Sequence, residues 1–389
     1  MNHTADAVVI GGGIMGASVA HFLAKKGAGR VVLVEKRSLA AVSTGHSAAV
    51  VRTFYSNPLT ITLAQRSLDM FENDRDMFGG DCGFKRIGYM CVFNDRSATS
   101  GRHVLALEKA QGVDAREISP TEIQDLVPPV HVDDLVGAIY EPHSGYVNPT
   151  KTTQVLCYSA KEYGLEIHEG TGVIGIELEG NRVAAVKTSQ GTIATRVVVN
   201  AAGPWGRAMG LSVGLNYSLR WSRESDLVLD RPEEVGDIPL ISDPTSQTYM
   251  RSNGKNEILG GRGFPKELEP MDIDDYDPNL DPDTRQCIEQ GLSRRIPALR
   301  QGRYLRGWAS IYAITDDWHP VVGSEPGLDG YYAFFGGSGH GFKLGPPLGE
   351  ALSDIILSQT PTTDIRAFRP NRFSEGELFT STWGGGNRA

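Results

Sequence analysis

Three glycines near the N-terminus have the spacing of a dinucleotide-binding site. Gly11, Gly13 and Gly16 fit the pattern G-x-G-x-x-G, and Glu35 follows the next apolar run. The first glycine permits a tight turn, the second lets the backbone approach a pyrophosphate, and the third lets a helix pack closely on a strand. A carboxylate at the position of Glu35 accepts hydrogen bonds from a ribose diol and repels a 2′-phosphate, which disfavours NADP.

The flanking residues predict the elements that would bring these groups together. Residues 7–10 form an apolar, β-branched run typical of a buried strand, residues 17–26 have an apolar helical face, and residues 31–34 predict a second strand. The N-terminus of the helix would point its N–H groups and its dipole at the pyrophosphate. A glycine-rich turn without a ligand is the alternative interpretation, and this unit alone does not distinguish FAD from NAD.

Small hydroxyl residues follow the second predicted strand. Ser43, Thr44 and Ser47 could donate hydrogen bonds to phosphates or to a flavin ring, and a solvated turn is the alternative. His46, among them, has three interpretations: a flavin neighbour, a covalent attachment point, or an ordinary histidine of a polar site.

A second glycine-rich loop lies near the C-terminus. An apolar strand at 331–335 leads into the loop 336–343, and a helix is predicted from near Pro346 through Leu357. The loop is not a Walker A motif, because Lys343 is not followed by Ser or Thr. It is not a nucleophile elbow either, because His340 stands where the second glycine is required.

The remaining chain alternates between strand and helix patterns. The predicted strand 193–199 leads into Asn200–Trp205, where a strand is again followed by a glycine and then a helix. Residues 267–283 form an acidic, proline-rich segment that we expect to be a surface loop. Helices are predicted at 58–78, 104–111, from Pro120, 149–163 and 284–295, and strands at 84–93, 173–178, 183–188 and across 217–264.

Composition limits the possible classes of protein. The chain has 389 residues, of which 40% are hydrophobic and 22% charged, which suits a soluble globular protein of two or three domains. Its 38 basic and 47 acidic residues give a net charge of −9, which argues against a general nucleic-acid or anionic-membrane surface. We expect no membrane span, no secretion signal, no metal site and no disulfide framework, and therefore a cytoplasmic location.

Four blocks in order resemble the D-amino-acid-oxidase superfamily of FAD enzymes. They are VVIGGGIMG with Glu35, STGHSAAVVR, VVVNAAGPW, and DWHPVVG followed by GGSGHGFKLGP, and they extend over nearly the whole chain. The resemblance is greatest to sarcosine oxidases, to sarcosine oxidase β-subunits and to dimethylglycine dehydrogenases. It implies an α/β (α+β) fold, with a Rossmann-like FAD-binding domain from 1–80, 142–215 and 308–389. A discontinuous substrate-binding domain with a large antiparallel sheet would come from 81–141 and 216–307.

The resemblance also implies the residues that bind FAD, which we expect to be held without a covalent bond. In that family the backbone at the position of Val173 faces the adenine, and the C-terminal glycine loop lies near the flavin pyrimidine ring. The predicted cofactor-binding residues are Gly11, Gly13, Ile14, Met15, Gly16, Glu35, Lys36, Ser43, Thr44, His46, Ser47, Ala48, Val173, Ala202, Gly203, Trp205, Gly337, Gly339, His340, Gly341, Phe342 and Lys343.

Arg52 and Lys343 match the family's clamp for a substrate carboxylate. A guanidinium binds a carboxylate through two parallel hydrogen bonds, and an ammonium adds a compact second charge. A surface ion pair is the alternative for Lys343. Tyr249 is predicted to line the substrate face, and packing within a sheet is its alternative.

Several positions depart from the family pattern. Tyr312 stands where glycine oxidases and D-amino-acid oxidases carry an arginine, which favours the sarcosine-type clamp. Ser310 stands where monomeric sarcosine oxidases carry the cysteine that binds FAD covalently. Their oxygen-activating lysine is replaced near Ile258, which leaves oxidase and dehydrogenase both open. The residues around His46 are similar to a dimethylglycine dehydrogenase segment, STWHAA, in which the histidine carries the flavin.

The resemblance implies FAD-dependent oxidation of a secondary amine, such as sarcosine, another N-substituted glycine or an imino acid. Hydride would pass to flavin N5, the imine would hydrolyse, and oxygen or another acceptor would reoxidise the flavin. We favour an oxidase that forms hydrogen peroxide. The alternatives are a 2-hydroxy-acid or polyol-phosphate dehydrogenase, a flavin-bearing subunit that needs partner chains, and an enzyme that uses NAD only. We expect a small-molecule substrate, no nucleic acid, and either a homo-oligomer or partner subunits.

Overall fold

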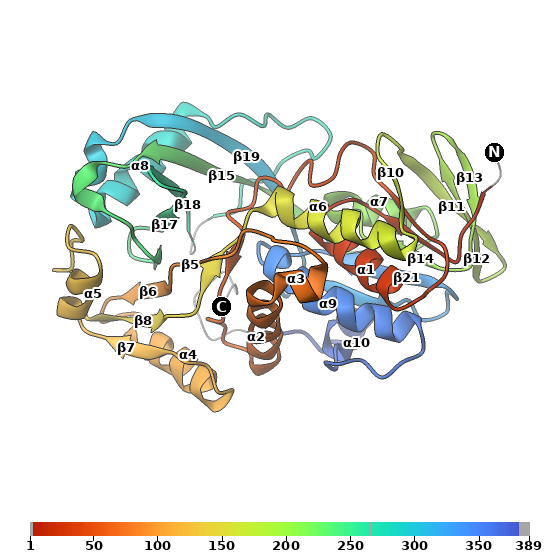
Figure 1. Cartoon of the computed structure of the whole chain (residues 1–389), viewed down its shortest axis with the longest axis horizontal. Helices are drawn as coiled ribbons and strands as arrows, with labels where there is room; N and C mark the ends of the chain where they lie inside the picture. Colours follow the sequence, from red (N-terminus) through yellow and green to blue (C-terminus); the bar gives the residue numbers. More distant parts are fainter. Residues whose placement is uncertain (1–2, 264–266, 381–389) are drawn as a thin grey trace.

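The structure is a computed structural model that describes residues 3–263 and 267–380. Two large sheets organise the molecule (Figure 1). A six-stranded sheet lies in the half that carries α1 and α9, and an eight-stranded sheet lies in the half that carries α8 and α4. The predicted fold class, a Rossmann-like α/β unit combined with a large antiparallel sheet, is confirmed.

The six-stranded sheet has the order β10-β3-β2-β14-β21-β20, and all neighbours are parallel except β20 and β21. Its strands are Ala7–Ile10 (β2), Val31–Val34 (β3), Glu166–His168 (β10), Val198–Asn200 (β14), Val321–Ser324 (β20) and Tyr331–Phe335 (β21). The central strands are valine-rich and buried on both faces, as a covered parallel sheet requires. Three distant parts of the chain therefore build one sheet.

Different layers cover the two faces of this sheet. Val9 and Leu33 pack in a core with α1 (Ile14–Lys25) and α9 (Gly341–Ile356), whereas Val8 and Val32 pack against an antiparallel sheet on the other side. That second sheet has the order β1-β13-β12-β11, with bounds His3–Thr4, Gly191–Ala194, Arg182–Thr188 and Val173–Glu179. The prediction of one strand over 193–199 is wrong, because residues 191–194 and 198–200 belong to different sheets.

The eight-stranded sheet has the order β19-β15-β18-β17-β16-β6-β8-β7. Its strands are Tyr89–Phe93 (β6), Arg116–Ile118 (β7), Gly137–Glu141 (β8), Arg220–Asp230 (β15), Leu240–Asp243 (β16), Thr248–Ser252 (β17), Glu257–Arg262 (β18) and Tyr304–Ile314 (β19). One face is apolar, and Leu227, Met250 and Ile258 pack there on α8 (Pro282–Arg295). Side chains alternate along a strand, so the neighbouring residues point to the opposite face.

Several helices differ in extent from their predictions. The helix expected over 58–78 is divided at Asn73 into α2 (Pro58–Glu72) and α3 (Asp74–Phe78), and the one expected at 104–111 already starts at Ala98, as α4 (Ala98–Ala110). The other helices are α5 (Pro120–Leu126), capped by Ser119, α6 (Pro149–Ser159), α7 (Gly206–Leu211) and α10 (Arg372–Glu375). A small sheet of β4 (Val50–Val51), β9 (Gly145–Tyr146) and β5 (Lys85–Arg86) joins the two halves.

The helix α9 begins at Gly341, not near Pro346 as predicted, so its two prolines lie inside it. Pro347 has no N–H to offer the carbonyl of Lys343. That carbonyl instead accepts a hydrogen bond from the Ser67 hydroxyl of α2, which lets the helix continue through the prolines. Gly349 faces Ser18 of α1 at a distance that leaves no room for a side chain, so the two helices approach closely.

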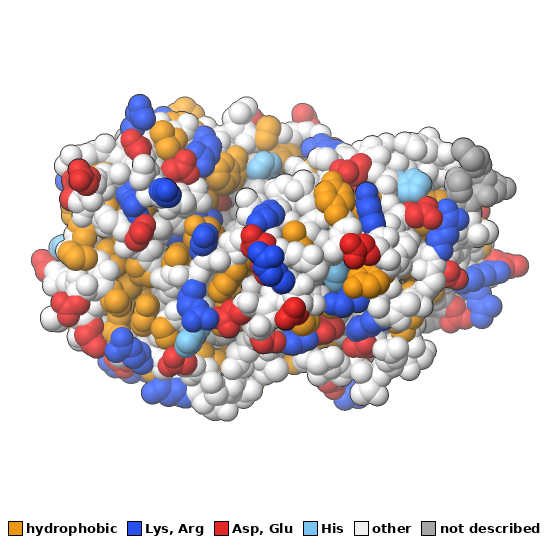
Figure 2. Space-filling model, viewed as in Figure 1, with side chains coloured by type: hydrophobic (Ala, Val, Ile, Leu, Met, Phe, Trp, Pro, Cys, Tyr) orange, Lys and Arg blue, Asp and Glu red, His pale blue; other side chains and the backbone are white. Residues whose placement is uncertain are grey.

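On the face shown in Figure 2, basic and acidic side chains are interspersed, and hydrophobic side chains gather over the region of β6 and β8. Within residues 3–263 and 267–380, no helix is both long and apolar enough to cross a bilayer. The same residues contain no group of three or more His, Cys, Asp or Glu side chains placed to hold a metal ion.

Candidate cofactor and substrate site

Three glycine-containing loops meet at one edge of the six-stranded sheet. The neighbouring strands β2, β14 and β21 end at Ile10, Asn200 and Phe335, and each is followed by a loop with glycine. Because parallel strands end at the same edge, the loops that start at Gly11, Ala201 and Gly336 lie side by side.

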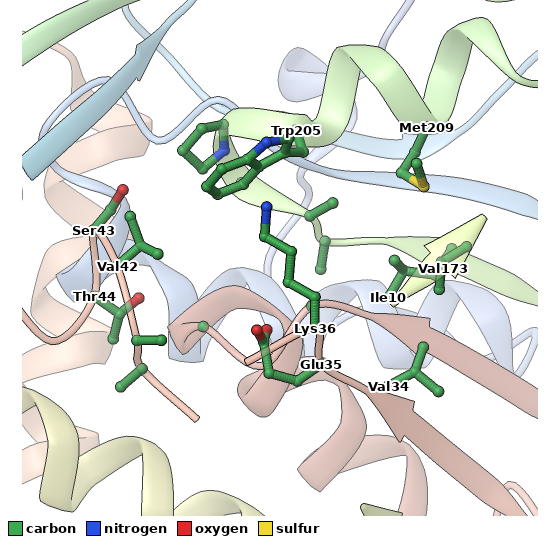
Figure 3. A pocket seen from close by; sticks show the side chains of 18 of the residues that line it. Ile10, Val34, Glu35, Lys36, Val42, Ser43, Thr44, Val173, Trp205 and Met209 are labelled. Carbon is green, nitrogen blue, oxygen red and sulfur yellow. The ribbon is translucent and has the colours of Figure 1, made fainter. Parts of the chain in front are cut away.

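A cavity opens along these loops (Figure 3). At one end Ile10, Val34, Val173 and Met209 form an apolar slot, and the Glu35 carboxylate lies beside it. The rest of the lining consists of Gly11, Gly13, Lys36, Ala40, Ala41, Val42, Ser43, Thr44, Thr171, Ala201, Ala202, Gly203, Pro204, Trp205 and Asp274.

A second cavity continues the first toward the C-terminal glycine loop. Both are lined by Gly13, Ser43, Thr44, Ala201, Gly203 and Pro204, so together they form one elongated space. The further lining residues are Ile14, Met15, Ser47, Ile311, Tyr312, Ala313, Gly336, Gly337, Ser338, Gly339, Gly341 and Phe342.

Hydrogen bonds fix the glycine turn and the hydroxyl segment. Glu35 Oε2 accepts from the backbone N–H of Gly12 at 2.7 Å, and its Oε1 accepts from that of Arg37 at 2.7 Å. Thr44 Oγ1 accepts from the N–H of Ile14 at 3.0 Å, so a residue of a later loop caps α1. The Ser43 hydroxyl donates to the carbonyl of Ile311 at 2.6 Å, which attaches this segment to β19.

The acidic loop 267–283 covers part of the first cavity. The Trp205 indole donates to Asp274 Oδ1 at 2.7 Å, and the Lys36 ammonium lies 3.2 Å from the centre of the Trp205 ring. In Figure 3 the Lys36 side chain points toward this indole across the cavity. The segment that we expected to be a surface loop therefore also helps to enclose the site.

The shape and the donor set of this space fit FAD. The apolar slot suits an adenine, and the neighbouring Glu35 carboxylate keeps acceptor capacity for a ribose diol. The glycine turn and the N-terminus of α1 suit a pyrophosphate. The far end, between the loop 336–341 and β19, offers backbone groups to a flat polar ring.

The two predicted clamp cations converge on one aromatic ring beside this far end. The Arg52 guanidinium carbon lies 4.7 Å from the centre of the Tyr55 ring, and the Lys343 ammonium lies 5.8 Å from it. Lys343 is only 6% exposed, which does not fit a surface ion pair. Arg52 also faces the Tyr89 ring at 5.3 Å and donates to the carbonyl of Phe54.

His340 lies against the same tyrosine. Its ring stacks on that of Tyr55 with centres 5.6 Å apart, and its Nε2 contacts the carbonyl of Trp318. A carbonyl oxygen accepts only, so Nε2 carries the proton. Burial lowers the pKa of His340 well below its ordinary value, and His319, Lys343 and Arg52 lower it further. The histidine is therefore neutral and adds no third charge.

The polar face of the eight-stranded sheet carries Tyr249. The register places Tyr249 of β17 opposite Gly261 of β18, and Gly261 opposite Asp226 of β15. The Tyr249 hydroxyl reaches across Gly261 and donates to Asp226 Oδ1. A methyl group at Gly261 would overlap that oxygen and lie 2.7 Å from the Tyr249 hydroxyl. The bridge therefore requires glycine at this position.

Arg251 lies on the same face, two residues beyond Tyr249. It is 3% exposed, packs 3.7 Å over the Tyr146 ring and donates to the carbonyl of Ala48 at 3.0 Å. Burial lowers its pKa to about 10. Arg251 thus connects the hydroxyl segment of the first half to the sheet of the second half.

A family model described as FAD dependent oxidoreductase, DAO, matches residues 6–355. The chain belongs to the DAO family of FAD-dependent oxidoreductases. FAD is therefore the cofactor of this DAO-family chain, and the interpretation as an enzyme that uses NAD only is excluded.

Individual relatives extend over nearly the whole chain. Mitochondrial sarcosine dehydrogenase of Mus musculus is 28% identical over 98% of this chain and 42% of that protein. Sarcosine oxidase subunit beta of an Arthrobacter species is 25% identical over 96% of this chain and 92% of that protein. The crystal structure of L-proline dehydrogenase from P. horikoshii superposes with a TM-score of 0.91 at 28% identity, covering 97% of this chain and 100% of that one. The DAO-family chain spans about two fifths of the sarcosine dehydrogenase.

Most of the predicted cofactor residues line the elongated space. They are Gly11, Gly13, Ile14, Met15, Glu35, Lys36, Ser43, Thr44, Ser47, Val173, Ala202, Gly203, Trp205, Gly337, Gly339, Gly341 and Phe342. Gly16, His46, Ala48, His340 and Lys343 lie outside these two linings. Gly16 packs against the Gly11 carbonyl, and the His46 ring stacks on Trp308. Contacts of these five residues with the cofactor remain predictions.

The structure also adds residues that the motifs did not indicate. Met209, Asp274 and Thr171 line the first cavity, and Tyr312 and Ser338 line the second. Ser338 lies inside the glycine loop and could have been included, whereas no local pattern marks Met209 or Asp274.

Ile258, near the predicted position of the oxygen-activating lysine, packs in the apolar core against α8. Leu259 and Gly261 are the β18 residues that pair on the polar face with Arg251 and Tyr249.

Proposed function

We propose that this FAD-dependent oxidoreductase oxidises a secondary amine that carries a carboxylate, such as sarcosine, another N-substituted glycine or an imino acid. The observation that carries the proposal is the convergence of Arg52 and Lys343 on Tyr55 beside the far end of the cofactor space. Two cations at this place suit an anionic group better than an amine or a sugar hydroxyl.

The chain's own residues would orient the substrate and control its protonation. Arg52 and Lys343 would hold the carboxylate, which positions the neighbouring C–H bond, an effect worth several kcal/mol of the barrier. Their positive charges also disfavour a protonated amine nearby, and the neutral amine is the reactive form. Acceptance of the hydride is the chemistry that bound FAD supplies.

The names of the relatives support the substrate class. Sarcosine dehydrogenase, sarcosine oxidase subunit beta and L-proline dehydrogenase are all named for secondary amines with a carboxylate. Oxygen is our predicted acceptor, and formation of hydrogen peroxide during turnover would support an oxidase. Turnover with an artificial dye but not with oxygen would contradict that part of the proposal.

Rapid mixing of the purified holoprotein with candidate substrates, without oxygen, tests the reaction. Sarcosine or proline should bleach the flavin absorption at ~450 nm, whereas secondary amines without a carboxylate should react far more slowly. Bleaching by 2-hydroxy acids or polyol phosphates alone would overturn the proposal in favour of the alternative dehydrogenases.

The relation to sarcosine oxidase subunit beta supports a further proposal, that partner subunits can assist turnover. Activity and molar mass of the purified single chain decide this point. A fully active single chain, whether monomer or homo-oligomer, would contradict a need for partners.

A further inference from the structure

Two buried glutamates lie directly behind Arg52. Glu108 of α4 is 0% exposed and Glu141, the last residue of β8, is 1% exposed. Both hold Thr53, the residue after Arg52: its N–H donates to Glu141 Oε2 at 2.8 Å, and its hydroxyl donates to Glu108 Oε1 at 3.4 Å. Three segments that are remote in sequence therefore meet at this point.

The remaining oxygens of the two carboxyl groups have no ordinary donor. Glu108 Oε2 and Glu141 Oε1 are buried, and no N–H or O–H group in the described part of the chain donates a hydrogen bond to either oxygen. Both carboxyl groups contact the same residue, Thr53, and a proton shared between them would give these two oxygens a partner. Glu141 Oε2 also accepts from the Ser144 hydroxyl, which leaves Oε1 for its carboxyl neighbour.

A contact between the two carboxyl groups requires one proton. Two ionised carboxylates in a buried site repel each other strongly, whereas one shared proton converts the repulsion into a charge-assisted hydrogen bond. Burial, together with the charge of Glu141, raises the pKa of Glu108 far above its ordinary value. The pair then carries a single negative charge at neutral pH.

That single charge faces Arg52. Glu141 stabilises the guanidinium electrostatically, as do the neighbouring Tyr89 and Tyr55. A buried cation needs such compensation. Arg52 donates to the carbonyl of Phe54, so the backbone that Thr53 anchors also holds the guanidinium.

We propose that Glu108 and Glu141 share one proton and act as a positioning pair that holds Arg52 through Thr53. The positioning part rests on the proposed function of Arg52 as an anchor for the substrate carboxylate. The shared proton itself rests only on the packing of these buried groups.

Infrared spectroscopy of the holoprotein tests the proton. The difference spectrum between the wild type and Glu108→Gln at pH 8 should contain the carbonyl band of a buried protonated carboxyl. The matched control Glu162→Gln, an exposed glutamate, should give no such band. Absence of the band in Glu108→Gln would overturn the shared proton.

Binding of acetate, followed by the change in the flavin spectrum, tests the positioning. Glu108→Gln keeps a neutral hydrogen-bonding group and should bind acetate within about two-fold of the wild type. Glu108→Ala should weaken binding about ten-fold, and the milder Thr53→Val should weaken it about three-fold, which keeps the test available if the alanine variant does not fold.

The outcomes separate the two proposals. Wild-type affinity in both Glu108→Ala and Thr53→Val would overturn the positioning role alone. No acetate binding by the wild type would overturn the proposed anchor function of Arg52, and the positioning role with it, while the infrared result would still decide whether the proton is shared.

Discussion

The ring of Tyr55 contacts two positively charged side chains. An aromatic face attracts a cation, and this attraction grows when water is excluded. Arg52 and Lys343 both lie over its ring, and the neutral His340 stacks against it. The repulsion between the two cations is best relieved by an anion between them, which is why we assign the carboxylate of a substrate to this position.

Removal of either cation should mainly impair substrates with a carboxylate. A charge-assisted hydrogen bond contributes roughly 1.5–3 kcal/mol, so Arg52→Ala and Lys343→Ala should each lower kcat/KM about 10- to 100-fold and raise KM. Arg52→Lys should recover only part of the loss, because a bidentate contact cannot form. Steady-state kinetics with sarcosine and proline checks this, and unchanged constants in both alanine variants would remove the clamp.

His46 is the candidate residue for a covalent bond to FAD. It stacks on Trp308, with ring centres 6.3 Å apart, outside the two cavity linings. We therefore expect acid precipitation of the holoprotein to release the yellow colour into the supernatant. Flavin that stays with the pellet, and is released from a His46→Ala variant, would show a covalent bond at this residue.

Strand register places the polar side chains of the eight-stranded sheet. Tyr249, Gly261 and Asp226 lie in one row across three neighbouring strands. Because Gly261 in the middle has no side chain, the side chains of Tyr249 and Asp226 can form a hydrogen bond. The bridge orients the tyrosine hydroxyl on the face that bears Arg251.

Gly261→Ala should break the bridge between Tyr249 and Asp226. We expect kcat/KM to fall by an amount similar to that of Tyr249→Phe, because both variants remove the same hydrogen bond, worth about 1–3 kcal/mol when a buried group is left unpaired. Gly175→Ala in β11, where a methyl group meets no atom within 4 Å, is the matched control. Equal activity of Gly261→Ala and the control would contradict a role of the bridge.

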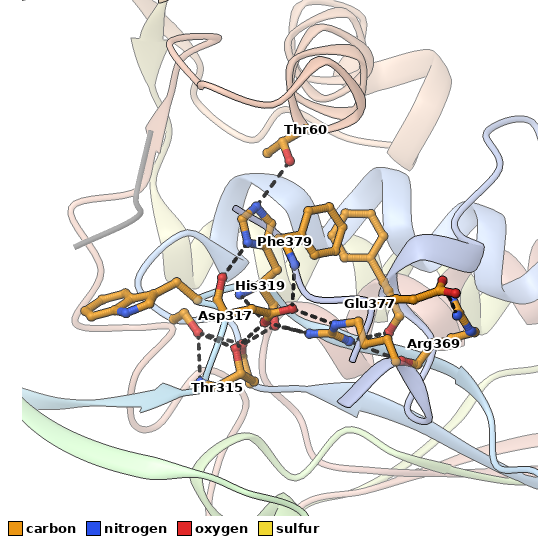
Figure 4. A network of polar contacts seen from close by, with 12 residues as sticks. Thr60, Thr315, Asp317, His319, Arg369, Glu377 and Phe379 are labelled. Carbon is orange, nitrogen blue, oxygen red and sulfur yellow. Dashed lines mark hydrogen bonds and ion pairs between the residues drawn. The ribbon is translucent and has the colours of Figure 1, made fainter. Parts of the chain in front are cut away.

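A buried ion pair attaches the C-terminal segment to the connection between β19 and β20 (Figure 4). Arg372 donates to both oxygens of Asp317 at 2.8 and 2.9 Å, and both side chains are 0% exposed. Next to it, the backbone between these strands positions His319 and the Trp318 carbonyl that His340 contacts.

Asp317→Asn should destabilise the protein, because it leaves the Arg372 guanidinium buried without its counter-ion. Breaking such a pair costs about 3–5 kcal/mol in free energy of unfolding. Urea unfolding measures this, and Asp364→Asn, which breaks the exposed pair with Arg366, is the control that we expect to have little effect. A double variant Asp317→Asn/Arg372→Met should recover part of the loss, and equal stability of the two single variants would contradict the anchor.

Buried neutral histidines should lower the stability of the protein in mild acid. Burial lowers the pKa of His21 and of His319 to about 4. In the unfolded chain these imidazoles have a pKa near ~6.5, so below that value the unfolded state binds protons that the native state does not. The contribution of these two histidines to the free energy of unfolding should therefore be constant above about pH 7 and fall progressively between about pH 6.5 and 4. The proton that the native state holds on Glu108 acts in the opposite direction, because its contribution to stability decreases as the pH rises.

Urea unfolding at pH 8, 6 and 5 measures this dependence. Between pH 8 and 5 the free energy of unfolding should change less unfavourably in His21→Gln than in the wild type, because one of the buried neutral histidines is absent. An identical loss in the variant would contradict the contribution of His21.

Local patterns determined the cofactor half to a large extent. The buried valine strands, the G-x-G-x-x-G turn, the helix after it and Glu35 are set by residues close together in sequence, so periodicity and turn chemistry predict them. The four family blocks added FAD, which the residues alone left open. The sequence did not predict that helices start at Ala98 and Gly341, or that the chain passes from one sheet to another between Ala194 and Val198. Where a helix starts, and which sheet a strand joins, depend on residues far away in the sequence.

The sequence by itself determined a dinucleotide unit and, through its four blocks, the enzyme family. Only the tertiary structure decided that β14 lies between β2 and β21, which brings their loops to one edge, and that Asp274 encloses the cavity. It also decided that Ile258 faces the core while Tyr249 faces Asp226, since a shift of one residue in register reverses every side chain of a strand. Contacts such as those of Glu108 and Glu141 with Thr53 join segments that no local pattern relates, because they depend on strand order and register across the whole chain.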